Sequence, residues 1–273
     1  MSGSKCASRA YSSPLHENDN PLVSIIMPLY NAESFVLETI ESVLKQSYLN
    51  WELIIVDDCS TDESYRVAQT FADGDNRILL FRNESNLGVA QTRNCGLERA
   101  QGGFVAFLDA DDAWLPEKLQ KQIDFMRLQD AAMCFTSYET IEADGSHRNY
   151  VHVPRRIDYK GFLKNTVTCS HTIMFDLSKV CKATLVCPSF EEEFDFPEDL
   201  VVWLSVLKTG VVAYGLDEVL AKNRKHETSR SADKRRAVAR TWNAYRKVEG
   251  LGFFYSAYCL IWQLYHAVLK RLR

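Results

Sequence analysis

Apolar runs alternate with helical segments from Leu22 to about residue 129. Four of the runs are rich in β-branched and aromatic residues: "LVSIIMPLY" (22–30), "WELIIVDD" (51–58), "RILLFRN" (77–83) and "GFVAFLDAD" (103–111). The segments 32–47, 62–73, 88–100 and 116–129 are predicted as helices. Strands that are apolar on both faces and alternate with helices are typical of a parallel sheet covered on both sides. The pattern therefore predicts an α/β fold.

Local signals predict where several elements begin and end. Ser60 and Glu63 have the spacing of a capping box for the helix at 62–73, and Pro116 suits the first position of the helix at 116–129. Further along the chain, the sequence predicts strands at 131–141 and 166–175, a helix at 197–210 that Gly210 stops, and a pair of strands at 211–226.

The two ends of the chain differ from its centre. Residues 1–20 are rich in Ser, Asn and Pro, lack an apolar signal segment and are predicted to form a flexible leader. Residues 21–231 are predicted to form one domain with halves at about 21–125 and 126–231, and residues 232–273 a pair of helices, one basic and one amphipathic. The eight cysteines show no CxxC pair and no zinc spacing, which is typical of reduced thiols in a cytosolic protein.

Charge is distributed unevenly along the chain. From Lys222 to the end there are 13 Lys and Arg against 3 Asp and Glu, whereas residues 1–221 hold 19 basic and 33 acidic side chains. An acidic body argues against a nucleic-acid-binding core. The basic tail predicts a contact with an anionic surface such as a bilayer.

The stretch 251–269 contains 19 uncharged residues, which is long enough for a membrane span by length alone. A narrow polar stripe interrupts it every three or four residues, at Gly252, Ser256, Cys259, Gln263, His266 and Lys270. We interpret the stretch as a helix that lies on the cytoplasmic membrane surface. Basic residues would assist it, namely Lys234, Arg235, Arg236, Arg240, Arg246 and Lys247. The alternative is a helix docked on the body of the protein or on a second copy in a homodimer.

Three acids, Asp109, Asp111 and Asp112, follow the fourth apolar run. Side chains at positions i and i+2 of an extended segment point to the same side, so Asp109 and Asp111 can share a divalent cation. Mg²⁺ and Mn²⁺ prefer carboxylate and phosphate oxygens as ligands. Asp112 is predicted to belong to the turn before the next helix. The alternative is a solvated acidic turn without a cation.

Asp57 and Asp58 end the second strand, at the sheet edge where ligands of parallel α/β proteins bind. They suit hydrogen bonds to a nucleoside base or ribose. They equally suit an acidic turn that leads, with Asp62, into the following helix.

Other polar residues also allow two interpretations. Arg93 on a predicted helix can orient acidic ligands or phosphates, or it can form a structural ion pair. Glu198 and Asp199 after Pro197 can be catalytic acids or partners of a helix dipole. His226 lies among basic residues, where it can be a ligand or a surface histidine.

In this order along the chain, the segments "VSIIMPLYNAESFVLETIESVLKQSYLNWELIIVDDCSTD" and "NLGVAQTRNCGLERAQGGFVAFLDADDAWLPEKLQKQ" resemble the family 2 glycosyltransferases of the bacterial surface-polysaccharide type. The resemblance is dense over residues 22–125 and thinner through "PEDLVVWL" and "RKHETSRS" to about residue 231. It implies a GT-A fold, a Rossmann-like, mixed and mainly parallel sheet sandwiched by helices, with a C-terminal helical extension.

The resemblance also implies roles for the residues that match the family motifs. Asp111 of the DxD motif is implied as a metal ligand, His226 as a second ligand and Asp199 as the catalytic base. The implied nucleotide contacts are Pro28, Tyr30, Asn31, Asp57, Asp58, Arg93, Asn94 and Asp109. Residues implied near donor or acceptor are Glu198, Trp203, Ser229 and Ser231.

The implied activity is a metal-dependent, inverting hexosyl or hexosaminyl transfer from a nucleotide-sugar, with UDP as the expected nucleotide. The implied acceptor is a lipid-linked or growing glycan in O-antigen, capsule or exopolysaccharide synthesis, and the implied location is the inner face of the cytoplasmic membrane.

Two other classes of protein are weighed against this one. A non-catalytic nucleotide-sugar-binding or scaffold protein of the same fold would be indicated by loss of the DxD or Glu198–Asp199 acids, and both are retained. A nucleotidyltransferase would need a glycine-rich, basic loop after the first strand, and "MPLYNAES" is not one.

Overall fold

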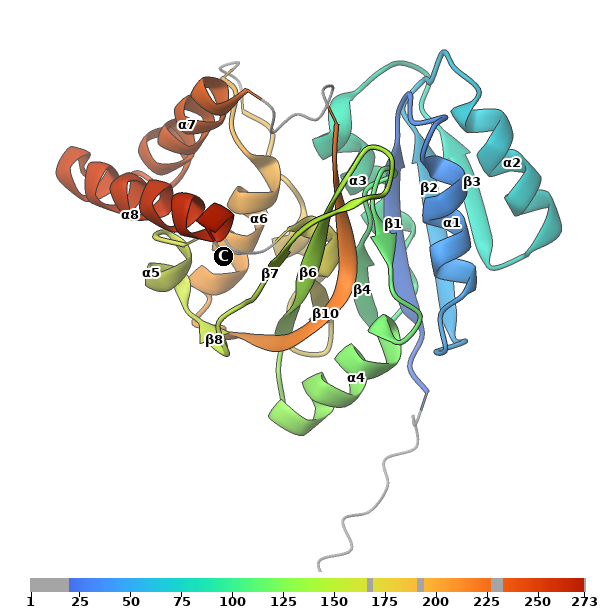
Figure 1. Ribbon diagram of the computed structural model, residues 1–273, viewed down its shortest axis with the longest axis horizontal. Helices are drawn as coiled ribbons and strands as arrows, with labels where there is room; N and C mark the ends of the chain where they lie inside the picture. Colours follow the sequence, from blue (N-terminus) through green and yellow to red (C-terminus); the bar gives the residue numbers. More distant parts are fainter. Residues whose placement is uncertain (1–19, 166–168, 191–193, 227–232, 273) are drawn as a thin grey trace, which may run out of the picture.

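The computed structural model describes residues 20–165, 169–190, 194–226 and 233–272. These residues build a mixed, 10-stranded sheet in the order β3-β2-β1-β4-β9-β6-β10-β5, with β7 paired to β6 and β8 to β10 (Figure 1). The predicted leader, apart from residue 20, lies outside the described residues.

The first half of the sheet is parallel, as the alternation of strands and helices predicts. It consists of β1 (Val23–Leu29), β2 (Trp51–Asp57), β3 (Ile78–Arg82) and β4 (Phe104–Phe107). The other strands are β5 (Ala113–Trp114), β6 (Met133–Glu142), β7 (His147–Val151), β8 (Arg156–Ile157), β9 (Met174–Asp176) and β10 (Ala213–Lys225). Because β9 runs antiparallel between β4 and β6, the sheet as a whole is mixed.

Helices cover both faces of the sheet and enclose two hydrophobic cores. Ile25 and Met27 of β1 belong to the core under α1 (Val36–Leu44), α2 (Ser64–Gly74) and α4 (Lys118–Gln129). Ile26, between them in the strand, belongs to the core under α3 (Gly88–Arg99) and α6 (Glu198–Lys208). The shorter elements are α5 (Tyr159–Phe162) and the 3₁₀ segments Ser170–Thr172 and Lys182–Leu185. Side chains of a strand alternate between faces, so one apolar run supplies both cores.

Two predicted helix starts are wrong. The Ser60 hydroxyl accepts a hydrogen bond from the amide of Asn31 (3.1 Å), so it does not cap α2. A carboxylate oxygen of Asp62 instead accepts the Ser64 amide (3.0 Å) at the start of that helix. Pro116 lies in the turn before α4, and its carbonyl accepts the Ser47 amide (2.8 Å). In both places a distant loop takes the group that local sequence assigns to the helix.

Two predicted strand regions also differ from the structure. In the described part of 166–175, only the end is a strand, because Ser170–Thr172 forms a 3₁₀ turn. The predicted pair at 211–226 is one strand, β10, which pairs with β6 and has register shifts between Leu216 and Ala221. These irregularities bend one strand where the sequence indicates two.

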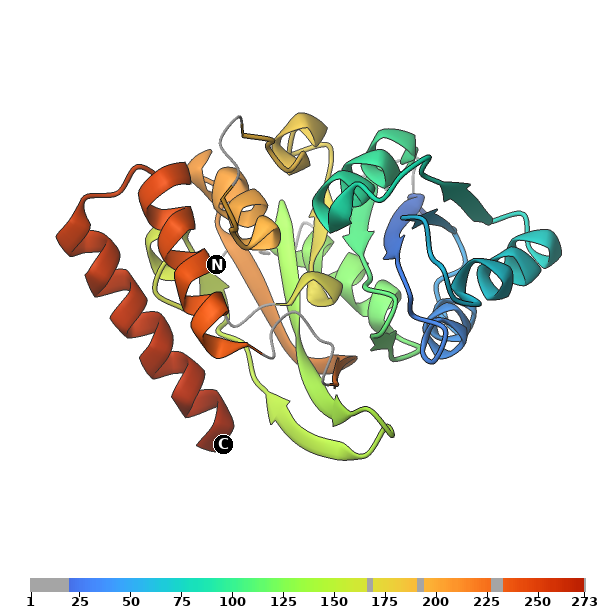
Figure 2. The same cartoon turned by 90° about the horizontal axis from the view of Figure 1, so that it is seen from above.

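The C-terminal extension consists of α7 (Lys234–Asn243), a π-helical segment (Ala244–Val248) and α8 (Phe253–Leu272). Figure 2 shows α7 and α8 side by side along the flank of the molecule that α6 occupies. Tyr245 and Cys259 are fully buried in the core that α6 helps to form. The extension therefore packs on the body. The expected division near residue 125 falls within α4, and the two halves share one sheet.

Candidate functional site

The carboxyl ends of β1, β2 and β4 bring three of the predicted segments to one edge of the sheet. Leu29 of β1 pairs with Asp57 of β2, and the chain continues from β1 into Tyr30 and Asn31. Tyr30 is exposed, and Asn31 adopts a left-handed backbone (φ 46°). The Asn31 carboxamide oxygen accepts the Thr61 amide (2.9 Å), so this side chain fastens the loop after β2 to the loop after β1. Pro28 is partly buried one residue before the end of β1.

Asp57 and Asp58 are both buried, and each holds a loop in place. Asp57 lies 3.2 Å from the guanidinium of Arg82 and accepts the Ser60 amide. Asp58 accepts the backbone amides of Leu87 and Gly88 (2.8 Å each) at the start of α3. These bonds favour the structural interpretation of both acids, and their contact with a nucleotide stays a prediction.

The acids after β4 lie in a turn and not in an extended segment. The strand ends at Phe107, and the Asp112 amide donates to the Asp109 carbonyl (3.1 Å). The expected extended i, i+2 geometry is therefore wrong, because Ala110 and Asp111 form the centre of the turn. The carboxylate of Asp109 forms an ion pair with Arg93, and that of Asp111 lies 2.8 Å from Nε2 of His226.

Asp112 is a buried acid and not a solvated turn residue. Its carboxylate lies 2.6 Å from Nδ1 of His171, which is fully buried, and accepts the Arg224 amide (2.8 Å). Burial alone would raise the pKa of Asp112, but His171 and the Arg224 amide lower it below its usual value. The Arg224 guanidinium donates to the carbonyl of Asp111 (3.1 Å). His171 and Arg224 thus hold the acidic turn in place through Asp112 and the Asp111 carbonyl. The sequence analysis predicts no role for either residue.

Two groups of side chains at this turn suit a divalent cation. The first is the predicted pair Asp111 and His226, both partly exposed, with Asp109 two residues away. In the second, one ligand atom from each of Asp109, Asp112 and His171 lies within 4.8 Å of the others. Asp112 and His171 are buried and engage each other, so the first group is the one that a diphosphate in solution could reach.

The electrostatics of the turn also suit a cation. Burial raises the pKa of Asp111 to about 6, and repulsion from Asp112 and Asp109 adds to the rise, against the opposing effect of His226. Like charges this close disfavour ionisation of one another, and a bound cation removes that cost. The carboxylates are ligands that Mn²⁺ and Mg²⁺ accept.

Arg93 of α3 connects the acidic turn to the start of α6. Its side chain is mostly buried, forms the ion pair with Asp109, and has Nη1 4.0 Å from the carboxylate of Glu198. Burial alone would lower the pKa of Arg93, but the carboxylates of Asp109, Glu198 and Asp199 outweigh it and raise that pKa. The guanidinium therefore stays charged between the two acidic motifs.

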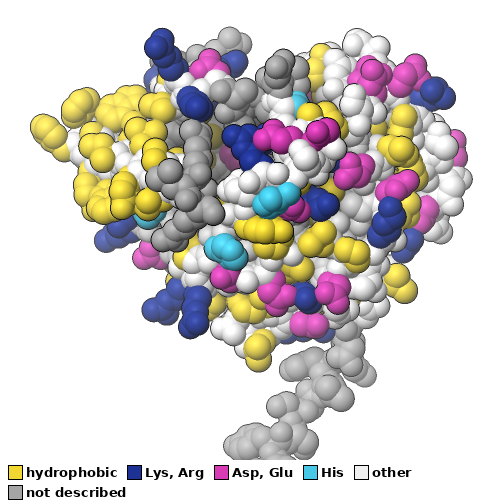
Figure 3. All heavy atoms as spheres, in the orientation of Figure 1, with side chains coloured by type: hydrophobic (Ala, Val, Ile, Leu, Met, Phe, Trp, Pro, Cys, Tyr) yellow, Lys and Arg dark blue, Asp and Glu magenta, His cyan; other side chains and the backbone are white. Residues whose placement is uncertain are grey.

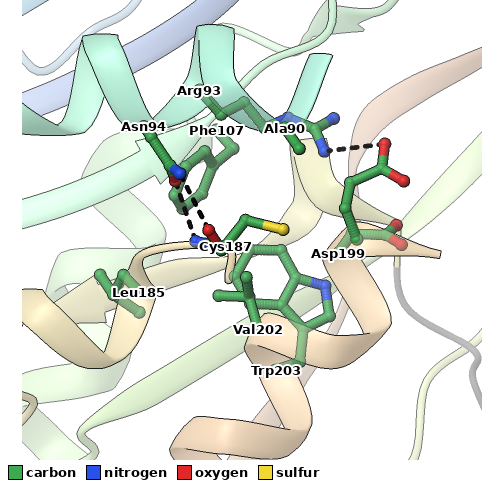
Figure 4. Close-up of a pocket in the computed structure, with 10 residues that line it drawn as sticks. Ala90, Arg93, Asn94, Phe107, Leu185, Cys187, Asp199, Val202 and Trp203 are labelled. Carbon is green, nitrogen blue, oxygen red and sulfur yellow. Dashed lines mark hydrogen bonds and ion pairs between the residues drawn. The ribbon is translucent and has the colours of Figure 1, made fainter. Parts of the chain in front are cut away.

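Asp199 is the second residue of α6. Together with Arg93 it lines a pocket (Figure 4). Its carboxylate accepts the Leu200 amide (2.8 Å) and the Ser170 hydroxyl (3.3 Å). Burial raises the pKa of Asp199 and the charge of Glu198 raises it further, while Arg93 opposes them. A carboxylate whose pKa is shifted toward neutrality is a better proton acceptor at neutral pH.

Part of the wall of the pocket, at Leu185 and Cys187, comes from a segment that sequence motifs did not identify. Leu185, Cys187, Val202 and Trp203 line it together with Ala90 and Phe107. The Asn94 carboxamide donates to the Cys187 carbonyl and accepts the Cys187 amide, both at 2.9 Å (Figure 4). Asn94, a predicted nucleotide contact, thus holds this wall on α3. No local pattern around Cys187 indicates the contact, since it joins residues 93 positions apart.

The packing of α3 against β1 requires glycine at position 96. A Cβ atom there would lie 2.7 Å from the Ile26 side chain, so only glycine lets α3 approach β1 this closely. Trp203, predicted near donor or acceptor, lines the pocket, whereas Ser229 and Ser231 lie outside the described residues.

Comparison with known proteins identifies the family. A family model described as "Glycosyl transferase family 2" matches residues 24–182. The chain belongs to this family. As a family 2 glycosyltransferase, it is 41% identical over 256 residues to the putative teichuronic acid biosynthesis glycosyltransferase TuaG of Bacillus subtilis, covering 93% of this chain and 99% of TuaG.

A second relative of this glycosyltransferase is an Escherichia coli enzyme. It is the UDP-Glc:alpha-D-GlcNAc-diphosphoundecaprenol beta-1,3-glucosyltransferase WfgD, 38% identical over 226 residues, covering 82% of this chain and 85% of WfgD.

Solved structures confirm the expected GT-A fold. S. aureus TarS (residues 1–349), in complex with UDP, superimposes with a TM-score of 0.62 at 22% identity, covering 75% of this chain and 61% of that one. The mannosyltransferase PcManGT of Pyrobaculum calidifontis, in complex with GDP-Man and Mn²⁺, superimposes with a TM-score of 0.65 at 17% identity. The match covers 89% of this chain and 69% of PcManGT.

Proposed function

We propose that this glycosyltransferase moves a sugar, with inversion, from a nucleotide-sugar donor, expected to be a UDP-sugar, to a lipid-linked or growing glycan in surface-polysaccharide synthesis. The observation that carries the proposal is the position of Arg93, between Asp109 of the acidic turn and Glu198 of α6. Arg93 thereby links the acidic turn, through its ion pair with Asp109, to the pocket that it lines together with the candidate base, Asp199. TuaG and WfgD support the polysaccharide role and the lipid-linked acceptor.

The residues of the chain divide the chemistry between the acidic turn and the pocket that Asp199 lines. Asp111 and His226 would hold the cation, with Asp109 beside them, and a bound divalent cation supplies positive charge to a leaving diphosphate. Arg93 adds a fixed positive charge there. In the pocket, Asp199 accepts the proton of the attacking acceptor hydroxyl. A diphosphate bound in this way leaves without protonation, so one base is sufficient.

The outer face of α8 supports a peripheral location on the inner face of the cytoplasmic membrane. Ser256 and Cys259 of the polar stripe are buried against the body, so the aromatic and aliphatic side chains around them point outward. Phe254 is 87% exposed and Ile261 66%. The exposed set also includes Phe253, Tyr255, Tyr258, Trp262, Leu264, Tyr265 and Val268. An apolar face of this extent marks an interaction surface.

An anionic bilayer is the partner that best fits this face. Figure 3 shows hydrophobic side chains gathered where α8 lies in Figure 1, with Lys and Arg side chains nearby. Tyr and Trp favour the boundary between water and lipid, and exposed Lys234, Arg235 and Arg246 suit lipid headgroups. No helix in the described part of the chain is long and apolar enough to cross a membrane.

A donor screen with the purified full-length protein tests the proposed activity. UDP-, GDP- and dTDP-sugars are each incubated with a synthetic diphosphate-lipid-linked sugar acceptor, with and without Mn²⁺ or Mg²⁺. We expect transfer from one donor class that depends on the cation. No transfer from any donor would favour a non-catalytic protein of the same fold.

A further inference from the structure

The segment that leads into α6 is bound by the C-terminal helix α7. The guanidinium of Arg240 donates to a carboxylate oxygen of Asp195 (2.7 Å), to the Phe196 carbonyl (2.7 Å) and to Oε2 of Glu198 (2.8 Å). Asn243, one turn later, donates to the Asp195 carbonyl (2.9 Å). The side chain of Arg240 is only 12% exposed. One mostly buried guanidinium therefore holds three groups of the segment 195–198, which leads into α6 and Asp199.

The far end of α6 is held by the same extension. Nζ of Lys208, the last residue of α6, lies 2.8 Å from the carboxylate of Glu249, which is almost fully buried. The Tyr159 hydroxyl also donates to that carboxylate. Glu249 lies between the π-helical segment and α8. Both ends of α6 are thus fastened to the helices that carry the proposed membrane-binding face.

We propose that Arg240 is a positioning residue for the transfer reaction: it holds Glu198 against Arg93 and thereby fixes Asp199, linking the C-terminal helices to the catalytic pocket. The proposal rests on the proposed function, because it assigns Asp199 the role of the base. Arg240 does not line the pocket and acts through Glu198.

The arrangement of charges explains why the contact matters. Glu198 has Oε2 against Arg240 and Oε1 4.0 Å from Arg93, while Arg93 also pairs with Asp109. Without the Arg240 charge, Arg93 remains as a cation beside Glu198. The attraction between Glu198 and Arg93 then competes with the ion pair between Arg93 and Asp109. The Glu198 side chain and the adjoining first turn of α6 also lose a fixed partner. A displacement of about 1 Å at a catalytic group can reduce the rate about 100-fold.

A purely architectural role for Arg240 would have different consequences. Arg236, on the same helix, binds the other oxygen of Asp195 (2.6 Å). Its side chain is 67% exposed and contacts Asp195 but not Glu198. Arg236→Gln therefore removes an α7 contact with the same acid and leaves the Glu198 contact in place, which makes it the matched control.

The test measures kcat and KM for the donor and the acceptor with the full-length protein and its Arg240→Gln, Arg240→Lys and Arg236→Gln variants, each with a thermal unfolding curve. We expect Arg240→Gln to lower kcat about 10-fold or more, with a smaller change in the donor KM, because Arg240 contacts the segment that carries Asp199 and not the acidic turn. Arg240→Lys keeps the charge without the planar fork, and we expect an intermediate kcat. Arg236→Gln should retain the wild-type kcat.

Each contrary result has a distinct meaning. A wild-type kcat in Arg240→Gln, or an equal fall in Arg236→Gln, would overturn the positioning role and leave the proposed function standing. If Arg240→Gln does not fold, a wild-type kcat in Arg240→Lys overturns the role in the same way. Absence of transfer by the wild-type protein would reject the proposed function, and the positioning role with it.

Discussion

The Nε2 atom of His226 lies 2.8 Å from Oδ2 of Asp111, although 115 residues separate them. The contact joins the residue after β10 to the turn after β4. Segments that follow two different strands of the sheet therefore meet at the proposed cation site. Burial and the neighbouring acids raise the pKa of Asp111. A bound cation would reverse this rise in pKa.

Asp111→Asn tests this site. The variant should lose sugar transfer and bind UDP with weaker dependence on Mn²⁺, because a carboxylate ligand is replaced by a neutral amide. Titration calorimetry of UDP with and without Mn²⁺ measures the effect. Asp124→Asn, on the exposed side of α4, is the control and should behave as wild type. Unchanged Mn²⁺-dependent UDP binding in Asp111→Asn would exclude Asp111 as a ligand.

Asp199→Asn separates the base from donor binding. Transfer should fall about 100- to 10,000-fold, since the amide cannot accept the acceptor proton, while UDP binding should stay close to wild type. Steady-state kinetics and UDP titration measure the two quantities. Transfer at nearly the wild-type rate would show that another group is the base.

Asn94 fixes the pocket wall through its two hydrogen bonds to Cys187. Asn94→Ala should lower the free energy of unfolding by about 1–3 kcal/mol, because it leaves buried backbone groups without partners. It should also raise the KM of the substrate that contacts this wall. Asn94→Asp keeps the oxygen that accepts the Cys187 amide but sets a second oxygen against the Cys187 carbonyl, so it should not restore the lost stability. Equal stability of the alanine variant and the wild type would show that the wall does not depend on Asn94.

Lys118 is a buried cation outside the site. Its ammonium donates to Gln122 and lies 3.9 Å above the Trp114 ring, and burial lowers its pKa from 10.5 to about 7. A lysine whose folded pKa is lowered binds its proton more tightly when unfolded. Protonation therefore reduces stability as pH falls from about 10.5 to about 7, and the effect is constant at lower pH.

Lys118→Met makes this effect measurable. The unfolding free energy of the variant minus that of the wild type should increase as pH falls from about 9.5 to about 7. The increase should be at most about 1.4 kcal/mol per pH unit. Chemical denaturation of both proteins across this range measures the difference. A difference that does not change with pH would show that Lys118 is charged in the folded protein throughout.

The outer face of α8 should bind anionic vesicles. Phe254→Ser and Ile261→Ser together should weaken sedimentation with phosphatidylglycerol vesicles, because both side chains are exposed and removing them costs no core packing. Leu128→Ser is the control, since that leucine is 79% exposed on α4. Undiminished vesicle binding would remove the membrane role, and a shift to monomer on gel filtration would identify a second copy as the partner.

The parallel half of the sheet could be predicted because each strand carries its own signal. The runs at β1, β2 and β4 are apolar on both faces, and the order of the chain then places their carboxyl ends together. Helix ends were harder to predict from the sequence. Ser60 has the local sequence of a helix cap, but its hydroxyl accepts a hydrogen bond from the Asn31 amide. Local propensity is overruled wherever a distant partner satisfies the same group.

The acidic turn shows the same limit within the site. The sequence indicates three clustered carboxylates, and only the fold shows that Asp112 is buried against His171. The partners His171, Cys187 and Arg240 come from segments without a recognisable motif, and each meets its site through contacts over more than 40 residues. Sequence motifs identify the groups that are proposed to meet the ligand, and they do not identify His171, Cys187 and Arg240, which hold some of those groups.

The central claim is that a cation at the acidic turn and a base on α6 act together on one nucleotide-sugar. The most direct measurement is sugar transfer from the preferred donor by the wild-type, Asp111→Asn and Asp199→Asn proteins, each after chelation and again after Mn²⁺ is restored. We predict that only the wild type transfers sugar, and only with the cation. Transfer at the wild-type rate by the chelated protein, or by either variant, would contradict the account.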